Sequence, residues 1–331
     1  MPINVMTGAN GNMSSQPQSF RTPADSSGNC ATRKIGPSFE TLSAQIEQLA
    51  SMPTVESILQ PLLSYLQQPF EQQDMQRIVD LISHDNSLAA QCLHMANSPL
   101  FGRWQSITTP RAAVAALGLQ RMRDIVLSCV VLKLIPDDNS GCNPVVFWEH
   151  SLACAMLARR MAKRLGVRDP EEAYLAGLMH DLGLIVNLRM MRNDFHGALQ
   201  RAQEERMSLF DVEESMWGFS HCDTGNLLAS KWGLTSVVID VIKHHHHNSQ
   251  LSEYQPMIAL IRLCDEVCRG NGLGYGFSEK LPDLCMHADL LNLMKDAWPA
   301  ARHVQWPQFA VEMNNYLNDV RKLIAVLFRF N

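Results

Sequence analysis

The 331-residue sequence predicts an all-α protein. From Ser38 onward, apolar residues return at spacings of three and four, which is the period of amphipathic helices. Pro and Gly stand at the ends of these periodic segments, as they do at the ends of helices. The sequence contains neither an internal repeat nor an alternation of strand and helix patterns. We therefore expect a helical protein built from two lobes.

The first predicted lobe spans residues 36–135. The preceding residues 1–35 are rich in Ser, Asn, Gly, Gln and Pro, so we expect a disordered tail, with a partner-binding segment as the alternative. The first helix has a single apolar stripe and is broken by Pro53, after which Thr54 can cap the next one. Helices of this lobe are expected over 39–52, 55–66, 76–85, 88–97, 109–118 and 121–135. Pro110 and Gly118 mark the start and end of the fifth.

The second predicted lobe spans residues 145–331. It follows a linker at 136–144, PDDNSGCNP, where Pro, Gly and Asp cluster as they do in loops. Helical patterns then cover 146–166, 171–190, 222–233, 235–247, 256–270 and 309–328, with a mixed polar and apolar segment before 216.

Bulk composition limits the classes of function. The formal net charge is −5 and the pI is about 6.2, which disfavours non-specific binding to nucleic acid. No apolar run is long enough to span a membrane, and no signal peptide pattern is present at the N-terminus. The nine cysteines form no C-x-x-C pair and several lie in apolar helical runs, which is typical of reduced, buried thiols. We expect a cytoplasmic protein.

Metal-capable side chains interrupt several apolar helix faces. His150, His245 and Asp265 each lie on the apolar face of a different predicted helix, and His180–Asp181 interrupt a fourth apolar segment, YLAGLMHDLGLIV. Imidazole nitrogens and carboxylate oxygens suit divalent first-row metals, and helices can converge on one ion. The sequence therefore indicates a metal-capable centre.

Each of these residues also has a simpler interpretation. A single His on an apolar face, such as His150, is usually a hydrogen-bonded core residue. The histidines 244–247 end a helix, where the dipole favours them. Asp265 has Arg262 within one helical turn as an ion-pair partner. Ser220 or His221 is a candidate helix cap. Their coincidence in one sequence favours the metal centre.

The sequence resembles the HD superfamily of metal-dependent phosphohydrolases, and more closely its HDOD branch (HD-related output domain), over residues 50–270. In the first lobe the resemblance rests on HDNSLAAQCLHMANSPLFG and ITTPRAAVAALGLQ, although Asn86 replaces the usual Pro. Positions that match the family are Asp85, Leu88, Asn97, Ser98, Ile107, Leu117 and Gly118. In the second lobe FWEHS, AGLMHDLG, HCDTG, KWGL and VIKHHH follow in family order. The resemblance implies an all-α fold, an HD-like helical bundle with an N-terminal helical HDOD lobe.

The resemblance also implies a ligand set for a divalent metal such as Mn, Fe, Mg or Zn. The ligands of the HD superfamily fall on His150, His180, Asp181 and Asp265. The extra histidines of the related cyclic-di-GMP phosphodiesterase branch fall on His221, His245 and His246.

The chain departs from that phosphodiesterase branch in two places. Leu184 stands where the branch has a Lys after its His-Asp pair, and His246 is followed by His247 and Asn248 instead of a Glu. A Gly-Tyr-Pro loop is absent, and GLGYGF at 272–277 does not supply it. The Lys would bind substrate phosphate, so these departures argue against cyclic-di-GMP hydrolysis.

Most members of the HDOD branch are regarded as non-catalytic signalling modules. We therefore expect a bacterial signal-transduction module that acts through contacts with signalling proteins, or that senses a ligand such as a nucleotide second messenger. We assign no catalytic residue. The alternative is a metal-dependent phosphohydrolase of a nucleotide or other phosphoester, in which His221, His245 or His246 would neutralise the leaving group. Nucleic acid and membrane are not expected as partners.

Overall fold

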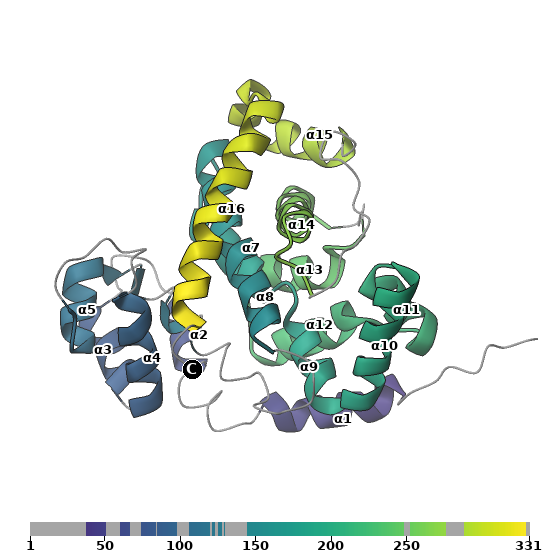
Figure 1. Cartoon of the computed structure of the whole chain (residues 1–331), viewed down its shortest axis with the longest axis horizontal. Coiled ribbons are helices and arrows are strands. Elements are labelled where there is room, and N and C mark those ends of the chain that lie inside the picture. The colour runs from purple at the N-terminus through teal and green to yellow at the C-terminus, as the bar shows by residue number, and fades with distance from the viewer. Residues whose placement is uncertain are drawn as a thin grey trace, which may run out of the picture. The chain divides into compact units, whose positions relative to one another are not determined.

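The computed structural model describes residues 38–50, 60–66, 74–83, 85–97, 106–119, 121–122, 125–127, 129, 144–247, 252–275 and 288–328. Within these ranges every regular element is a helix (Figure 1), so the expectation of an all-α fold is confirmed. The elements are α1 (Phe39–Ala50), α2 (Gln60–Leu66), α3 (Met75–Ser83), α4 (Asn86–Ala96), α5 (Pro110–Leu117), α7 (Pro144–Leu165), α8 (Pro170–Met179), α9 (Leu182–Met190), α10 (Arg192–Glu205), α11 (Leu209–Trp217), α12 (His221–Lys231), α13 (Ser236–His244), α14 (Gln255–Gly270), α15 (Ala288–Ala297), a 3₁₀ helix (Pro299–His303) and α16 (Trp306–Phe328).

The predicted tail and linker fall on parts of the chain that are not described. Residues 1–35 lie wholly outside the described ranges, and of the linker 136–144 only Pro144 lies inside them. The described helices all belong to one compact unit, Lys34–Asn331. The division of that unit into two lobes therefore stays a prediction. Among the described helices, none has the length and apolarity that crossing a bilayer requires.

Local side-chain chemistry fixes the ends of the short N-terminal helices. Thr109 caps α5, because its hydroxyl oxygen accepts from the Ala112 N–H at 3.1 Å, and Pro110 takes the first helical position. Gly118 follows the last residue of α5 with a φ of 84°, a conformation that glycine tolerates. The predicted ends of this helix are therefore confirmed. The Asp85 carboxylate likewise accepts from the Leu88 N–H at 3.0 Å and caps the start of α4.

Asn97 joins the end of α4 to the segment that precedes α5. Its amide oxygen accepts from the Ile107 N–H at 2.7 Å, and its amide nitrogen donates to the Ile107 carbonyl at 2.8 Å. Both residues are positions at which the sequence matches the HDOD pattern, and the structure gives that pattern a physical reason. The interior between α3, α4 and α5 is apolar, with Ile78, Leu88 and Val114 fully buried.

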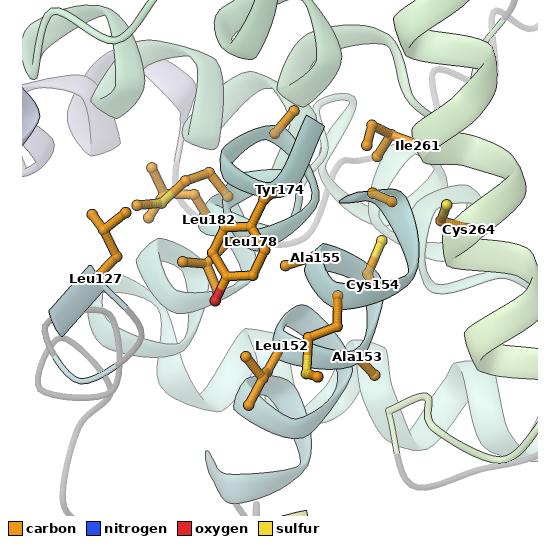
Figure 2. Close-up of a cluster of buried hydrophobic side chains, with 14 of the residues drawn as sticks. Leu127, Leu152, Ala153, Cys154, Ala155, Tyr174, Leu178, Leu182, Ile261 and Cys264 are labelled. Atoms are coloured by element: carbon orange, nitrogen blue, oxygen red, sulfur yellow. The ribbon is translucent and has the colours of Figure 1, made fainter. Parts of the chain in front are cut away.

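Helix α7 is the centre of the C-terminal helices and packs against α8, α14 and α16 (Figure 1). Figure 2 shows Cys154 and Ala155 of α7 close to Leu178 of α8, with Ile261 of α14 on the other side. The close approach of α7 and α8 depends on Gly177, because a Cβ there would lie 2.9 Å from the Ala155 Cα atom. Small residues therefore bring these two helices together.

Helices α9 and α12 cross even more closely. A Cβ on Gly183 would lie 1.8 Å from the His221 carbonyl oxygen, which no rotamer change can relieve because the obstacle is backbone. On the facing helix, a Cβ on Gly225 would lie 2.8 Å from the Gly183 nitrogen. The glycine that follows the His-Asp pair thus sets where His221 lies.

Helix α1 packs on α12 and α9. The Phe39 ring lies 5.4 Å from that of Phe219, and the Lys231 ammonium pairs with the Glu47 carboxylate at 2.8 Å. The exposed ion pair contributes little, so the apolar contacts hold this helix in place.

The chain breaks its helix at His180–Asp181. The segment 171–190 was predicted as a single periodic element, whereas α8 ends at Met179 and α9 starts at Leu182. Asp181 has a φ of −98° and a ψ of 19°, and its side chain makes no helix-capping hydrogen bond. Adjacent side chains of a continuous helix point in directions about 100° apart. The break instead allows His180 and Asp181 to face the same point.

Candidate metal centre

The seven residues predicted as metal ligands lie together in the interior of the C-terminal helices. They come from α7 (His150), the α8–α9 break (His180, Asp181), the first turn of α12 (His221), the end of α13 (His245, His246) and α14 (Asp265). Six of them are between 0% and 4% exposed, and His246 is partly buried. Side chains up to 115 residues apart in the sequence thus meet at one buried point.

Four of the ligands make up what we call the first half-site: His150, His180, Asp265 and the Oδ2 atom of Asp181. The His150 Nε2 atom lies 3.2 Å from His180 Nε2, 3.2 Å from Asp265 Oδ1 and 3.4 Å from Asp181 Oδ2. The His180 Nε2 atom lies 3.3 Å from Asp181 Oδ2 and 4.0 Å from Asp265 Oδ1. Two imidazoles and two carboxylates therefore converge.

The second half-site consists of His221, His245, His246 and the Oδ1 atom of Asp181. The Nε2 atoms of His221 and His246 are 3.1 Å apart. Asp181 Oδ1 lies 3.5 Å from His221 Nε2 and 3.4 Å from His245 Nε2. Because each carboxylate oxygen faces a different set of histidines, Asp181 bridges the two half-sites.

Hydrogen bonds on the far side of four imidazole rings fix which nitrogen points inward. The Nδ1 atom of His150 donates to the Leu273 carbonyl at 2.6 Å, that of His180 to the Gly177 carbonyl at 2.8 Å, and that of His245 to the Ile242 carbonyl at 3.0 Å. The Nδ1 atom of His221 faces the Glu213 carboxylate at 2.5 Å. A carbonyl can only accept, so these Nδ1 atoms carry the hydrogen. When these rings are neutral, they therefore present Nε2 lone pairs to the centre, as metal-binding histidines do.

The geometry fits divalent cations. Two nitrogens bound to one tetrahedral ion at 2.0–2.1 Å would be about 3.3 Å apart, close to the 3.1 Å and 3.2 Å that separate the facing Nε2 pairs. Two facing lone pairs repel each other unless a cation or a proton lies between them. In addition, Asp181 Oδ1 and His245 Nε2 are buried without a hydrogen-bond partner. Buried polar atoms of this kind call for a ligand.

The charges of the centre act on each other strongly. Burial alone would raise the pKa of Asp181, but His180, His245 and His150 hold it well below its usual range. Burial opposes the cationic form of His245, yet Cys222 and Asp181 raise its pKa to about 10. His246 is the exception, because burial and the adjacent His245 and His221 hold its pKa well below the usual range. The carboxylates thus attract positive charge, either protons or a metal.

Cys222 is a further donor beside the second half-site. Its Sγ atom lies 3.9 Å from His245 Nδ1, and the thiol falls within the cluster formed by His221, His245 and His246. Burial would raise the pKa of this thiol, but the neighbouring His245 and His221 lower it to about 7. The six cysteines among the described residues are buried thiols, as the sequence predicts.

Three residues that contact the ligands were not predicted from the sequence. Glu213 of α11 and Arg269 of α14 bind His221 and Asp265, and the Tyr275 hydroxyl donates to Asp181 Oδ2 at 2.8 Å. One sequence feature could have indicated that Glu213 is buried: it lies four residues after Leu209, on the same apolar face of the helix. Tyr275 belongs to the GLGYGF segment, and this residue reaches the centre although the segment is not a Gly-Tyr-Pro loop.

Two of the simpler interpretations are corrected or refined. Asp265 does not pair with Arg262, which instead donates to Glu266 at 3.1 Å; Arg269, on the other side of Asp265, is its partner. Ser220 is the residue that precedes α12, and its N–H donates to the Asp223 carboxylate at 2.9 Å. His221 is therefore free to turn its ring inward.

Comparison with known proteins places these observations in a family. The model of the HDOD domain matches residues 52–248, more than half of the chain. A protein of Treponema pallidum described as uncharacterized is 24% identical over 208 residues, which cover 62% of this chain and 40% of that protein. The chain thus spans less than half the length of this relative.

Solved structures share the fold. An HDOD domain protein of unknown function from Geobacter sulfurreducens has a TM-score of 0.72 at 25% identity, over 88% of this chain and 99% of that one. A provisionally named signal transduction protein from Marinobacter aquaeolei has a TM-score of 0.68 at 17% identity, over 87% and 64%. A provisionally named phosphohydrolase from Shewanella amazonensis has a TM-score of 0.65 at 21% identity, over 86% of this chain and 97% of that one. The family match and the shared fold together establish that the chain belongs to the HDOD domain family.

Proposed function

We propose that this protein is a cytoplasmic signal-transduction module whose helical core holds divalent metal, and that it acts on signalling proteins or senses a nucleotide through the surrounding helices. The observation that carries the proposal is the gathering of seven metal-capable side chains in the protein interior. His150, His180, His221, His245 and Asp265 have no exposed surface at all. A substrate phosphate would need to approach the ions, whereas a structural or sensory ion needs no such access.

Residues around the shell support a regulatory role over hydrolysis. Leu184, at the position of the substrate-binding Lys in the phosphodiesterase branch, is 1% exposed and lies in the apolar core. Arg269 binds both oxygens of Asp265, and Lys243 pairs with Asp223. These two cations are therefore engaged by carboxylates of the chain itself.

A hydrolase is the second candidate, and one observation favours it. Asp181 faces four imidazoles, two through each of its carboxylate oxygens, so one carboxylate could bridge two ions. A metal pair supplies, when bound, Lewis acidity toward a phosphoester and a water of lowered pKa. The chain's own part would be to orient the imidazoles through their Nδ1 hydrogen bonds and to exclude bulk water.

Metal content and turnover, measured on the same sample, separate the two candidates. The full chain is purified without a polyhistidine tag and analysed for bound metal by mass spectrometry. It is then incubated with cyclic dinucleotides and a generic phosphodiester in the presence of Mn²⁺. We expect bound metal in the wild type, none in Asp181→Ala, and no turnover. Turnover that is lost in Asp181→Ala would establish the hydrolase, and a wild-type protein that takes up no metal would refute both.

A further inference from the structure

Two charged residues of opposite sign stand directly behind the two half-sites. Glu213 contacts a ligand of the second half-site and Arg269 a ligand of the first. Neither belongs to the ligand set implied by the family. Because a charge next to a ligand changes how strongly that ligand attracts a cation, the two half-sites have different electrostatic surroundings.

Glu213 is a carboxylate with no exposed surface that is committed to His221. Its Oε2 atom faces His221 Nδ1 at 2.5 Å and accepts from the His221 backbone N–H at 2.9 Å. The carboxylate keeps the hydrogen of the ring on Nδ1 and raises the electron density at Nε2, which is the atom that faces Asp181. A carboxylate–histidine pair of this kind makes the imidazole a stronger metal ligand.

The other oxygen of Glu213 is held just as firmly. Glu213 Oε1 accepts from the Asn187 amide nitrogen at 3.0 Å, and the Asn187 amide oxygen accepts from the Thr224 hydroxyl at 2.9 Å. Asn187 and Thr224 are themselves fully buried. The network links α9, α11 and α12, so Glu213 cannot turn away from His221 without leaving several buried groups unpaired.

Arg269 does the opposite at the first half-site. Its Nε atom donates to Asp265 Oδ1 at 2.9 Å and its Nη2 atom to Asp265 Oδ2 at 2.8 Å. The same guanidinium that stabilises the carboxylate neutralises its charge and repels a divalent ion nearby. Asp265 therefore attracts a metal less strongly than an unpaired carboxylate would.

We infer that the two half-sites are unequal: Glu213 strengthens the second, Arg269 weakens the first, and the first equivalent of metal binds to His221, His245, His246 and Asp181. The first half-site then fills at a higher metal concentration. The inference rests on the proposed function in one respect, that the cluster binds divalent metal. It adds the order of binding and the two positioning residues that set that order.

The test is a calorimetric titration of the full chain, stripped of metal by a chelator, with Mn²⁺. We expect two binding steps in the wild type. Glu213→Gln keeps the shape of the side chain and removes its charge, and should weaken the tighter step about 10–100-fold without changing the weaker one. Arg269→Gln should tighten the weaker step at least several-fold. His246→Ala should remove the tighter step, and His150→Ala the weaker.

Matched controls remove the same charges from the same helices. Glu214→Gln changes the exposed neighbour of Glu213, and Arg262→Gln removes a guanidinium of α14 that pairs with Glu266. Both should leave the two steps unchanged. If Glu213→Gln does not fold, Glu213→Asp tests the same point, since it keeps the charge and should keep the order of the steps.

The outcomes separate this inference from the proposed function. Two equal steps, equal weakening of both by Glu213→Gln, or a tighter step that survives His246→Ala would overturn the unequal half-sites while metal binding stands. Absence of any binding by folded wild-type protein would overturn both. A Mn²⁺ electron paramagnetic resonance spectrum at one equivalent gives a second readout, which should change in Glu213→Gln and stay unchanged in Arg262→Gln.

Discussion

The N-terminal helices and the C-terminal helices differ in the kinds of side chain that they bury. Among the described residues, every buried polar or charged side chain lies between His150 and Asp265, and none lies in α1 to α5. The N-terminal interior is filled by residues such as Ile78, Ile82 and Leu88. Burying polar groups costs free energy unless they are paired. In the part of the chain that the structure describes, the groups that could bind a ligand therefore lie in the C-terminal interior, whereas the fully buried side chains of the N-terminal interior are apolar.

The largest expected effect tests the packing side of this comparison. Leu88→Ala would open a cavity in a fully buried position of α4 and should lower the free energy of unfolding by ~2–5 kcal/mol. Because the described residues of this core form no cluster of metal-capable groups, metal content per folded molecule should stay unchanged. Urea denaturation and metal analysis of the same sample measure both quantities. Loss of metal from protein that remains folded would show that the two interiors are not separable.

Gly183→Ala should connect packing to the centre. The added Cβ would meet the His221 carbonyl oxygen at 1.8 Å, so α9 and α12 must move apart at a cost of ~1–3 kcal/mol. Since that movement displaces His221, metal affinity should fall as well. Gly197→Ala in α10 is the control, because the added Cβ meets nothing within 4 Å. This substitution should stabilise the helix by ~0.5–1 kcal/mol. Unchanged metal binding in Gly183→Ala would contradict the proposed role of this crossing.

The pH dependence of stability should differ between metal-free and metal-loaded protein. The pKa of His245 is raised to about 10 in the folded state, and that of an unfolded His is ~6.5. Its contribution to metal-free stability is therefore fully present below ~6.5 and is lost as pH rises through about 10. The melting temperature of the metal-free protein should fall by about 2 °C per pH unit in that window.

Metal replaces the proton at His245, so the metal-loaded protein should lose little stability over the same window. The stabilisation by metal should thus grow with pH. Thermal melting with and without chelator at a series of pH values measures this difference, and His245→Gln is the control that should flatten the metal-free curve. If the melting temperatures of the metal-free and metal-loaded wild type changed equally with pH, proton and metal would not be competing for the His245 imidazole.

The smallest effect is expected at a helix end. Thr109→Ala removes the hydroxyl that accepts from the Ala112 N–H and should cost ~1 kcal/mol. Thr109→Ser keeps the oxygen and should cost less. Urea denaturation checks both variants. An equal loss for Ala and Ser would show that the methyl group, and not the cap, stabilises α5.

Local rules predicted much of the fold. Helix period gave the all-α class, and Thr109, Pro110 and Gly118 gave the limits of α5, because these signals act within one helical turn. The same rules missed the break at His180–Asp181. That break lies beside the crossing of α9 with α12 at Gly183, a contact between residues far apart in the sequence that local rules do not include.

The candidate ligands could be predicted from residue types, but the residues that contact them could not. The seven candidate ligands could be chosen from metal-capable side chains on apolar faces and from the family pattern, and the structure brings them together. Three residues at the site were not predicted: Glu213, Arg269 and Tyr275. They contact the ligands and are not ligands themselves, and Glu and Arg on helices are most often solvent-exposed. The partner of Asp265 lay one turn after it rather than one turn before, a choice that spacing alone cannot make.

The central claim is that the buried His and Asp cluster holds divalent metal, and thermal stability tests it most directly. The melting temperature of chelator-treated wild-type protein and of Asp181→Asn is compared before and after addition of Mn²⁺ or Zn²⁺. At a metal concentration of about 1,000 times the dissociation constant, binding adds ~4 kcal/mol, which corresponds to roughly 6 °C for a chain of this length. We predict a rise of this size in the wild type and none in Asp181→Asn. Equal melting temperatures of wild-type protein with and without metal would contradict the claim.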